Sequence, residues 1–309
     1  MLKFLMNSFP GKPSESNYEN WEIFNHKNYT EANEIRQKEI RRLTSLARYE
    51  IEKSSKHSWL KKYFFPYIKP EEFENKVVLD LGCFTAGRVI SWAEEFRFGK
   101  CYGIDINPIF KIAGEEFAKE KNIDAEFFTS QNEDLPFENN SIDILISTDT
   151  FEHVNDLNKS MQECYRVLKP GGKLLALFPQ YLQPFESHLN FVTKLPFLHW
   201  FFSSKKLTEV YFQILEDRGK DAYWYKSKKN YLEKWERLPT INGTSIRMFE
   251  SILNNEPWKV QWIKRPIFYD GRKADLLIFK LLKTLIYPLV FIKYLDEFFM
   301  GRICVICKK

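Results

Sequence analysis

The chain alternates short apolar runs with longer segments in which apolar residues recur every three or four positions. Val77–Leu79 is an apolar run that leads into Asp80 and Gly82. Such a run is typical of a parallel strand that is buried on both faces and opens into a tight turn before a helix. That helix is predicted from about Arg88 to Phe96.

The same alternation repeats as far as residue 179. Further strands are predicted at Cys101–Ile106, Asp124–Thr129, Asn140–Ser147 and after Gly171 and Gly172 as far as Pro179. The helices between them are predicted from about Ile109 to Lys121, and from about Asp156 until Gly171 and Gly172 end it. Strands that alternate with helices predict an open parallel sheet, in which ligands bind at the carboxyl ends of the strands.

Several motifs in this region resemble one family. The segment from Lys76 to Gly87 is similar to motif I, D-x-G-x-G-x-G, of the class I S-adenosylmethionine-dependent methyltransferases, with Phe84 and Ala86 in the second and third glycine positions. Asn-Asn-Ser-Ile-Asp, Phe-Glu-His-Val and Arg-Val-Leu-Lys-Pro-Gly-Gly follow in the order seen in the type 11 methyltransferase domain. The resemblance covers residues 76 to 179 and makes the chain a predicted member of that family.

The resemblance implies an α/β fold, the Rossmann-like seven-stranded methyltransferase sheet of order 3-2-1-4-5-7-6 with strand 7 antiparallel. Residues 258 to 265 and Arg302 to Lys308 are the expected last two strands, and a helix is expected from about Thr244 to Leu253. We expect an N-terminal helical segment at 1–70 and the methyltransferase domain at 71–309. A substrate-side insertion at 180–240 and a helical insertion at 270–300 would interrupt that domain.

Two parts of the N-terminal segment differ in pattern. Residues 1 to 20 contain Pro10, Gly11 and Pro13 and are expected to be irregular. From Thr30 to about Leu60, apolar residues recur at helical spacing among charged ones. This pattern predicts one or two amphipathic helices against the domain or over its cofactor pocket.

An acidic residue ends the second predicted strand. Asp105 lies 25 residues after Asp80, one strand-and-helix unit further along. A carboxylate at this place accepts hydrogen bonds from both ribose hydroxyls of any adenosine cofactor. The turn after the first strand lacks the G-x-G-x-x-G pattern that a dinucleotide pyrophosphate requires, which favours S-adenosylmethionine over NAD.

The family resemblance then implies a set of donor-binding residues. Gln131 stands where the family usually has Asp, and its amide oxygen can still accept from the adenine amino group. For Glu133 and Asp134 the alternative is a polar surface turn. The residues expected to face S-adenosyl-L-methionine are Asp80, Gly82, Phe84, Asp105, Ile106, Gln131, Asn132 and Thr148.

The candidate catalytic residues are His153, His188 and Tyr181. Asp149, Glu152 and His153 resemble an acid-x-x-Glu-His element that holds a divalent cation in ubiquinone-type O-methyltransferases. Three roles stay open for His153: a metal-free general base, which we expect, a ligand of such an ion, or a structural residue.

The predicted insertion is rich in aromatic residues and histidine. Tyr181, Phe185, His188 and His199 are expected to face the acceptor, and an aromatic core beneath a structural flap is the alternative.

Composition adds a charge asymmetry. The 309 residues carry a formal net charge of +5, with 44% hydrophobic residues, typical of a globular protein. Residues 205–309 contain 21 Lys+Arg and 12 Asp+Glu, a net of +9, which leaves −4 for residues 1–204. This asymmetry is compatible with an anionic substrate, a membrane surface or simply solvated lysines. No nucleic-acid module is recognisable.

Cysteine usage indicates a reducing compartment. There are five scattered cysteines, and Cys304 and Cys307 are expected to point to opposite faces of a strand rather than to bind a metal. The N-terminus lacks the pattern of a signal peptide, so a cytoplasmic location is expected.

Residues 274–300 form a long apolar connection between the last two expected strands. Its longest uncharged run is about nine residues, well short of the ~20 that span a bilayer. A helical hairpin packed on the core, a homodimer interface and peripheral membrane contact through 276–300 all stay open.

We therefore expect a methyltransferase that acts on a small-molecule, glycan or lipid-linked acceptor, at an oxygen. A catalytically inactive S-adenosylmethionine-binding or interaction module is the alternative, suggested by Phe84 and Ala86. A nucleotide-dependent oxidoreductase is a third interpretation.

Overall fold

A computed structural model describes residues 1–11, 59–184, 189, 192–218, 241–269 and 276–309. The chain divides into two compact units. The first comprises Met1–Ile23, Phe178–Ser251 and Lys264–Ile303, and the second Phe24–Leu177, Ile252–Ile263 and Cys304–Lys309. The predicted helices at residues 30–60 lie outside the described residues except at their end, and the predicted division at residue 70 stays a prediction.

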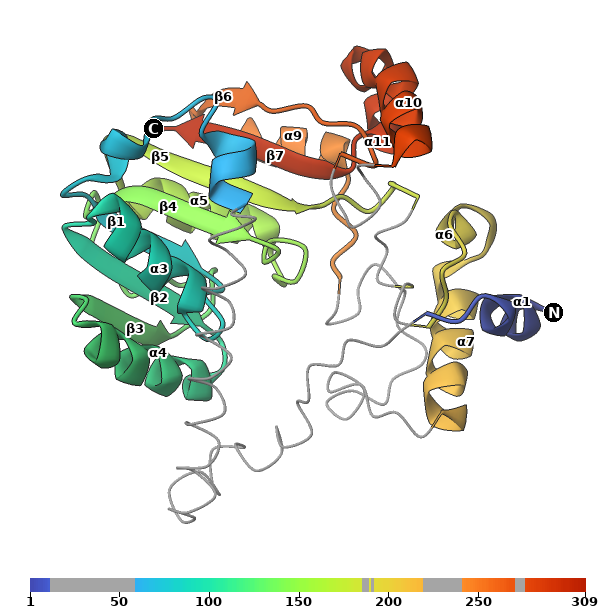
Figure 1. Cartoon of the computed structure of the whole chain (residues 1–309), viewed down its shortest axis with the longest axis horizontal. Coiled ribbons are helices and arrows are strands. Elements are labelled where there is room, and N and C mark those ends of the chain that lie inside the picture. Colours follow the sequence, from blue (N-terminus) through green and yellow to red (C-terminus); the bar gives the residue numbers. More distant parts are fainter. Residues whose placement is uncertain (12–58, 185–188, 190–191, 219–240, 270–275) are drawn as a thin grey trace. The chain divides into compact units, whose positions relative to one another are not determined.

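The strands form one seven-stranded sheet in the order β3-β2-β1-β4-β5-β7-β6 (Figure 1). Their bounds are β1 Val77–Leu81, β2 Lys100–Asp105, β3 Ala125–Thr129, β4 Ile142–Thr148, β5 Leu168–Pro179, β6 Lys259–Trp262 and β7 Arg302–Lys308. The first five strands run parallel, whereas β6 and β7 pair antiparallel. The predicted fold and strand order are confirmed.

The strand order reverses between β1 and β4, which lie side by side with Leu79 opposite Leu145. From β1 the chain moves outward to β2 and β3, and from β4 it moves the other way to β5. Because each crossover is right-handed, its helix lies on one face before the reversal and on the other face after it. Accordingly, α3 (Gly87–Phe96) and α4 (Pro108–Lys121) lie in front of the strands in Figure 1, and α5 (Leu157–Val167) behind them.

The helix before β5 ends earlier than predicted. Helix α5 stops at Val167, and Leu168 already has extended backbone with ψ 137°. Pro170 disfavours helical backbone at Lys169, so the helix ends ahead of the two glycines rather than at them. Leu168 pairs with Ile142, and after a shift of register the ladder resumes at Ile144 and Lys173.

The first unit contains helices that the sequence pattern did not predict. They are α1 (Leu2–Ser8), α6 (Leu198–Phe201) and α7 (Ser204–Asp217). The expectation of irregular structure is wrong for α1, because Leu2 and Met6 lie one turn apart and are buried in a cluster with apolar residues of α7. The Ser203 side chain caps α7 by accepting from the N–H of Lys206. Helix α9 (Ile246–Leu253) confirms the helix expected there.

The connection from β6 to β7 is helical, as expected. It contains α10 (Leu277–Ile286), the 3₁₀ turn η6 (Tyr287–Phe291) and α11 (Asp296–Phe299). None of the helices in the described part of the chain is both long enough and apolar enough to span a bilayer. The strand β6 is shorter than the predicted 258–265. All five cysteines, including Cys304 and Cys307 on β7, are buried and form no disulfide.

Two short turns precede the sheet. The π-helical turn η2 (Leu60–Phe64) and the 3₁₀ turn η3 (Pro70–Phe73) lead into β1. Phe73 is buried and stacks on Phe98 with ring centroids 5.8 Å apart. These contacts join the chain ahead of β1 to the segment that follows α3.

Candidate donor site at the carboxyl ends of β1, β2 and β4

The turn after β1 has left-handed backbone at alternate residues. The φ angles are +70° at Gly82, +50° at Phe84 and +61° at Ala86. A side chain on Gly82 would also overlap the hydroxyl and methyl of Thr150, so only glycine fits there. Phe84 and Ala86, at the second and third glycine positions of the motif, thus also have left-handed backbone.

Asp105 holds this turn from the end of β2. Its Oδ2 accepts from the backbone N–H of Phe84 at 3.1 Å, and its Oδ1 accepts from that of Asn107 at 3.0 Å. Burial raises the pKa of Asp105 from 3.8 to about 6, against the effect of these hydrogen bonds. A carboxylate offers about four acceptor positions, so acceptor capacity is left at Asp105.

Apolar side chains belong to two neighbours of Asp105. These are Phe84, whose N–H it accepts, and Ile106, which follows it in the sequence. The Phe84 ring packs against the Phe110 ring with centroids 4.3 Å apart. Ile106, directly after the acid, is 73% exposed although it is apolar. An apolar ligand surface such as a purine face would remove this side chain from water.

The predicted adenine residues differ in environment. Gln131 is exposed and Asn132 is buried. Asp134 is exposed, as a surface turn requires, but Glu133 is buried. The surface-turn alternative is therefore wrong for Glu133.

Glu133 links two loops at the ligand-binding edge. Its Oε1 accepts from the N–H of Asn155 at 2.8 Å and from that of Asp156 at 3.0 Å. Asp156 in turn caps α5 by accepting from the N–H of Lys159. The loop after β3 is thus fixed to the loop after β4.

Thr148 ends β4 and Thr150 follows it, directly beside the turn after β1. The hydroxyl of Thr150 donates to the carbonyl of Leu81 at 3.0 Å and lies 3.2 Å from that of Thr148. Because β1 and β4 are the strands at which the order reverses, this contact lies where open α/β sheets bind ligands.

His153 follows in the same loop and donates its backbone N–H to the carbonyl of Thr150 at 2.9 Å. Its side chain is 41% exposed, and Nε2 lies 3.6 Å from Oε1 of the buried Glu152. That distance allows charge stabilisation but is too long for a hydrogen bond. Asp149 has φ +55° and is exposed. Among the described residues, no three acidic, histidine or cysteine side chains converge as a metal site.

Arg166 joins the end of α5 to the segment before β4. Its guanidinium donates to both oxygens of Glu163, to the carbonyls of Leu135 and Phe137, and to Oδ1 of Asn139, at 2.7 to 2.9 Å. The five N–H groups of an arginine are all used. This contact raises the pKa of Arg166 and lowers that of Glu163. The Arg of the Arg-Val-Leu-Lys-Pro-Gly-Gly motif therefore fixes the loop before β4 that contains Leu135 and Phe137.

Asp143, the acid of Asn-Asn-Ser-Ile-Asp, has a similar structural role. Its Oδ2 accepts from the backbone N–H of Val77 at 3.0 Å and from Nζ of Lys169 at 2.8 Å. It thus joins the beginnings of β1, β4 and β5 at the edge opposite the ligand site.

The other candidate residues belong to the first unit. Tyr181 and His199 lie together, with ring centroids 5.4 Å apart, and burial lowers the pKa of His199 to about 4. His199 is therefore neutral at pH 7. Phe185 and His188 lie outside the described residues. The roles expected for these four residues stay predictions.

Comparison with known proteins identifies the domain. Residues 79–176 match the type 11 methyltransferase domain model. The malonyl-[acyl-carrier protein] O-methyltransferase 1 of Coxiella burnetii is 26% identical over 189 residues, which are 59% of this chain and 63% of that protein. The demethylmenaquinone methyltransferase of Lactiplantibacillus plantarum is 25% identical over 170 residues, 54% of this chain and 68% of that protein. The chain thus spans less than two thirds of the first of these relatives.

A solved structure adds a more distant likeness. The S-adenosylmethionine-dependent methyltransferase from Mesorhizobium loti aligns with 77% of this chain and 93% of its own, at a TM-score of 0.49 and 13% identity. At this level the assignment of the fold rests on the strand order described above. That order defines an open, doubly wound α/β domain with a ligand site at its reversal. Together with the domain match, it makes residues 79–176 a class I S-adenosylmethionine-dependent methyltransferase domain.

The residues present fit an adenosine-containing donor. Asp105 has acceptor capacity left at the end of β2, and Ile106 beside it is an exposed apolar side chain. Thr150, Glu133 and Arg166 were missed as site-forming residues in the sequence. Arg166 could have been found there, since it begins a recognised motif. Thr150 could not, because its role depends on a contact with Gly82, which follows the neighbouring strand β1.

Proposed function

We propose that this chain transfers a methyl group from S-adenosylmethionine to a small-molecule, glycan or lipid-linked acceptor, at an oxygen. The observation that carries the proposal is the Asp105 carboxylate. It lies in the matched domain at the end of β2, holds the turn after β1 and keeps acceptor capacity. Two ribose hydroxyls would supply the missing charge-assisted hydrogen bonds.

The proposed donor contacts extend to three neighbouring segments. Ile106 would cover one face of the adenine, and Asn132 and Gln131 would lie along its edge. Gly82 and Phe84 would present the turn after β1, with Asp80 and Thr148 at the ends of the two central strands. Support comes from the shared edge on which all of these residues lie.

When bound, S-adenosylmethionine supplies an electrophilic methyl group on a sulfonium centre. The task of the protein is then to hold the acceptor oxygen in line with that carbon and to exclude water. His153 would take the proton of the acceptor hydroxyl. The buried carboxylate of Glu152, 3.6 Å from Nε2, would stabilise the imidazolium that results.

The acceptor class rests on the names of the relatives. The Coxiella burnetii relative and the tocopherol O-methyltransferase of Arabidopsis thaliana are O-methyltransferases by name, whereas a Caenorhabditis elegans relative is a phosphoethanolamine N-methyltransferase. We propose oxygen because His153 is available as a base at the ligand edge. Tyr181 and His188 are proposed contributors from the insertion.

Calorimetric titration separates the proposal from an oxidoreductase, because a methyltransferase or an inactive relative binds S-adenosylmethionine and not NAD. Labelled donor incubated with a metabolite extract then separates the active enzyme from the inactive module. Binding without transfer to any component would favour the inactive module. NAD binding in place of S-adenosylmethionine would overturn both.

The role of His153 is tested in the presence of an acceptor found in this way. His153→Ala should lose turnover while donor affinity is unchanged, and a chelator should have no effect. Loss of turnover with chelator would instead support a divalent ion at Asp149, Glu152 and His153. Full activity of His153→Ala would leave the residue with a structural role only.

A further inference from the structure

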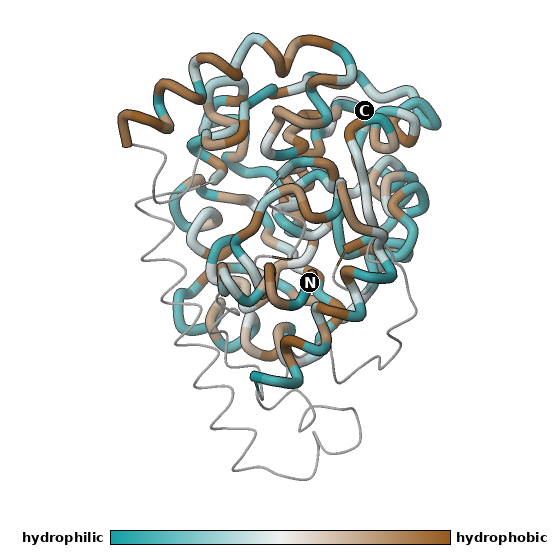
Figure 2. Tube along the Cα trace, turned by 90° about the vertical axis from the view of Figure 1, so that its right-hand side faces the viewer, coloured by the Kyte–Doolittle hydropathy of each residue, from teal (hydrophilic) through white to brown (hydrophobic). Residues whose placement is uncertain are grey.

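The segment of residues 276–295 displays its apolar side chains to solvent. Along α10, the exposed side chains recur at helical spacing, and they continue through η6 to Leu295. They are Leu276, Leu277, Ile278, Leu281, Leu282, Leu285, Tyr287, Phe291, Ile292, Tyr294 and Leu295. Figure 2 shows this segment as the mostly brown, hydrophobic coil at the top of the view. We call it the apolar surface.

Helix α10 turns its apolar side to solvent, opposite to the usual arrangement of a helix on a protein surface. Leu277, Leu281 and Leu285 follow one another at intervals of four residues, so they form one stripe, and each is more than half exposed. No residue of α10 is buried, and Lys283 is more covered than these leucines. Its ammonium group lies 5.9 Å from the centre of the Tyr269 ring. In a helix packed on a protein core the apolar stripe would be covered and the lysines exposed.

The other side of this segment is held in place. Val290 is completely buried, and the Phe279 ring lies 5.0 Å from that of Phe268. Beyond the segment, Met300 forms a β-bridge with Pro266. The leucine stripe is therefore the outer side of an anchored element.

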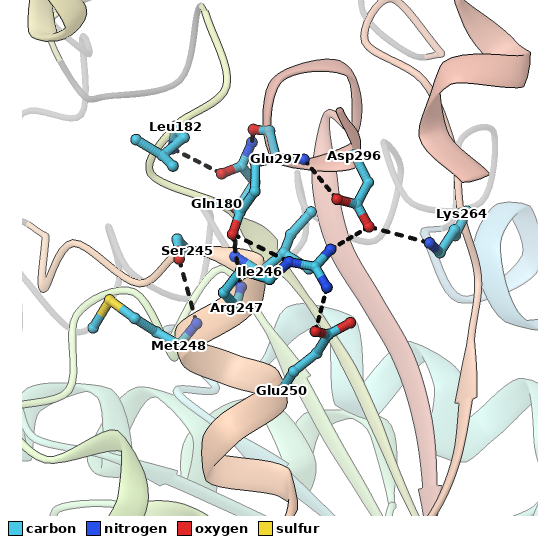
Figure 3. A network of polar contacts seen from close by, with 10 residues as sticks. All are labelled: Gln180, Leu182, Ser245, Ile246, Arg247, Met248, Glu250, Lys264, Asp296 and Glu297. Carbon is cyan, nitrogen blue, oxygen red and sulfur yellow. Dashed lines mark hydrogen bonds and ion pairs between the residues drawn. The ribbon is translucent and has the colours of Figure 1, made fainter. Parts of the chain in front are cut away.

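A buried ionic network holds the C-terminal end of the segment (Figure 3). Both oxygens of Glu297 accept backbone N–H groups at the start of α9, from Ile246 at 2.9 Å and Arg247 at 2.8 Å. Asp296 pairs with the guanidinium of Arg247 and with Nζ of Lys264 at 3.2 Å. The only acids in residues 276–309 are thus buried and engaged inside the unit.

The apolar surface consequently carries positive charge alone. Residues 276–295 contain Lys280, Lys283 and Lys293 and no acid. Lys280 and Lys293 are exposed, and tyrosines stand among the apolar residues at 287 and 294. Leucines flanked by lysine and tyrosine match the boundary of a bilayer, where apolar groups enter the acyl region and cations stay with the headgroups.

We propose that residues 276–295 dock this protein on an anionic phospholipid bilayer, lying in the plane of the interface. Charge complementarity favours this occupant over a second copy of the chain. A twofold symmetric dimer through this surface would bring two sets of lysines together with no acid to pair them. Docking of this kind does not depend on the methyl-transfer reaction, so the two are measured separately.

The test is cosedimentation of the full chain with vesicles. We expect binding to vesicles that contain phosphatidylglycerol in phosphatidylcholine, and weak binding to phosphatidylcholine alone. Leu281→Asp together with Leu285→Asp should abolish binding. Replacing Lys280 and Lys293 by Ala should lower the partition coefficient roughly fivefold for each lysine, from about 1 kcal/mol per basic residue.

Phe4→Asp is the matched control. Phe4 on α1 is 74% exposed and Leu285 is 73% exposed, so Phe4→Asp and the single change Leu285→Asp add the same charge to equally exposed apolar sites. Phe4→Asp should bind vesicles like the unaltered chain. An equal loss from Phe4→Asp would overturn the assignment to residues 276–295.

Two further results would overturn the proposal. One is the absence of binding to vesicles with phosphatidylglycerol in a chain whose circular dichroism shows it folded. The other is a dimer in analytical ultracentrifugation that Leu281→Asp converts to a monomer, which would assign the surface to a second copy. The lysine variants give independent evidence, since they leave the leucine stripe unchanged.

Discussion

Two regions of the chain, residues 79–176 and residues 276–295, differ in where their characteristic side chains lie. In the first, the polar motif residues Asp105, Asp143 and Arg166 bond to the backbone of neighbouring segments. In the second, the leucines of α10 point to solvent, and the lysine between them lies against a ring. The first region thus finds its partners within the fold, whereas the second presents a surface suited to a partner outside the chain.

The comparison also separates two uses of charged side chains. Arg166 and Glu163 fix the loop that leads from β3 to β4. Arg247, Asp296 and Glu297 fix the end of the segment that carries the apolar surface. Both networks position a functional element without belonging to it. The predictions below begin with the largest expected effect.

Arg166→Ala should lower the free energy of unfolding by about 2 to 4 kcal/mol, because it removes several charge-assisted hydrogen bonds and leaves Glu163 without its guanidinium. Urea denaturation measures this change. Arg97→Ala is the matched control, since Arg97 forms an exposed ion pair with Glu74 and should change stability by less than about 1 kcal/mol. Equal effects of the two changes would show that the Arg166 contacts do not fix the loop.

Asp105→Ala should weaken binding of S-adenosylmethionine by about 2 to 4 kcal/mol, given the roughly 1.5 to 3 kcal/mol of a hydrogen bond to a charged group. Calorimetry on the folded variant measures the affinity. Glu126→Ala on the neighbouring strand β3 is the control, because its carboxylate pairs with Lys100 on the surface. Unchanged affinity in a folded Asp105→Ala chain would remove Asp105 from the donor site.

Donor affinity should also depend on pH through Asp105. Its pKa of about 6 in the folded chain is raised by burial, and hydrogen bonds from ribose hydroxyls favour the ionised form. Affinity should therefore be highest above pH 6 and fall about tenfold for each pH unit below it, as long as only the ionised form binds. Asp105→Asn should flatten this dependence between pH 5 and about 7.

The stability of the chain without donor should depend on pH with the opposite sign. Because the folded pKa of Asp105 is raised above its unfolded value, the folded chain binds more protons between pH 4 and about 6. Its contribution to stability is complete below the unfolded pKa and is lost as pH rises through 6. Denaturation across this range, compared with Asp105→Asn, tests the sign.

The fold was predictable because its signals are local. The acid of motif I and the run before it define β1, and Asp105 follows one strand-and-helix unit later. The order of the strands followed from the resemblance to the family. The end of α5 was predicted too late, because the effect of Pro170 on the preceding residue was given less weight than the two glycines.

The contacts between distant segments could not be predicted in the same way. The packing of Thr150 on Gly82, and the buried position of Glu133, depend on how loops from different strands meet. Helix α1 forms because Leu2 and Met6 find an apolar cluster far along the chain. The periodicity of α10 predicted a helix, but periodicity does not say what an apolar stripe contacts.

The smallest expected effect tests most directly the contrast between residues 79–176 and residues 276–295. Leu281 is 57% exposed on α10, so Leu281→Asp should change the free energy of unfolding by no more than about 0.5 kcal/mol, as for ordinary surface positions. Leu207→Asp on α7 is the matched change at a buried leucine. It should cost several kcal/mol, roughly 4 or more, because it places an unpaired charge in the apolar cluster.

Urea denaturation of both variants, in the absence of lipid, shows whether the leucine stripe is covered by the chain itself. If the stripe is kept for a partner outside the chain, Leu281→Asp leaves stability unchanged and removes only vesicle binding. A loss similar to that of Leu207→Asp would mean that the leucines of α10 are covered by the chain itself in solution. Residues 276–295 would then be part of the core, and the contrast with residues 79–176 would not hold.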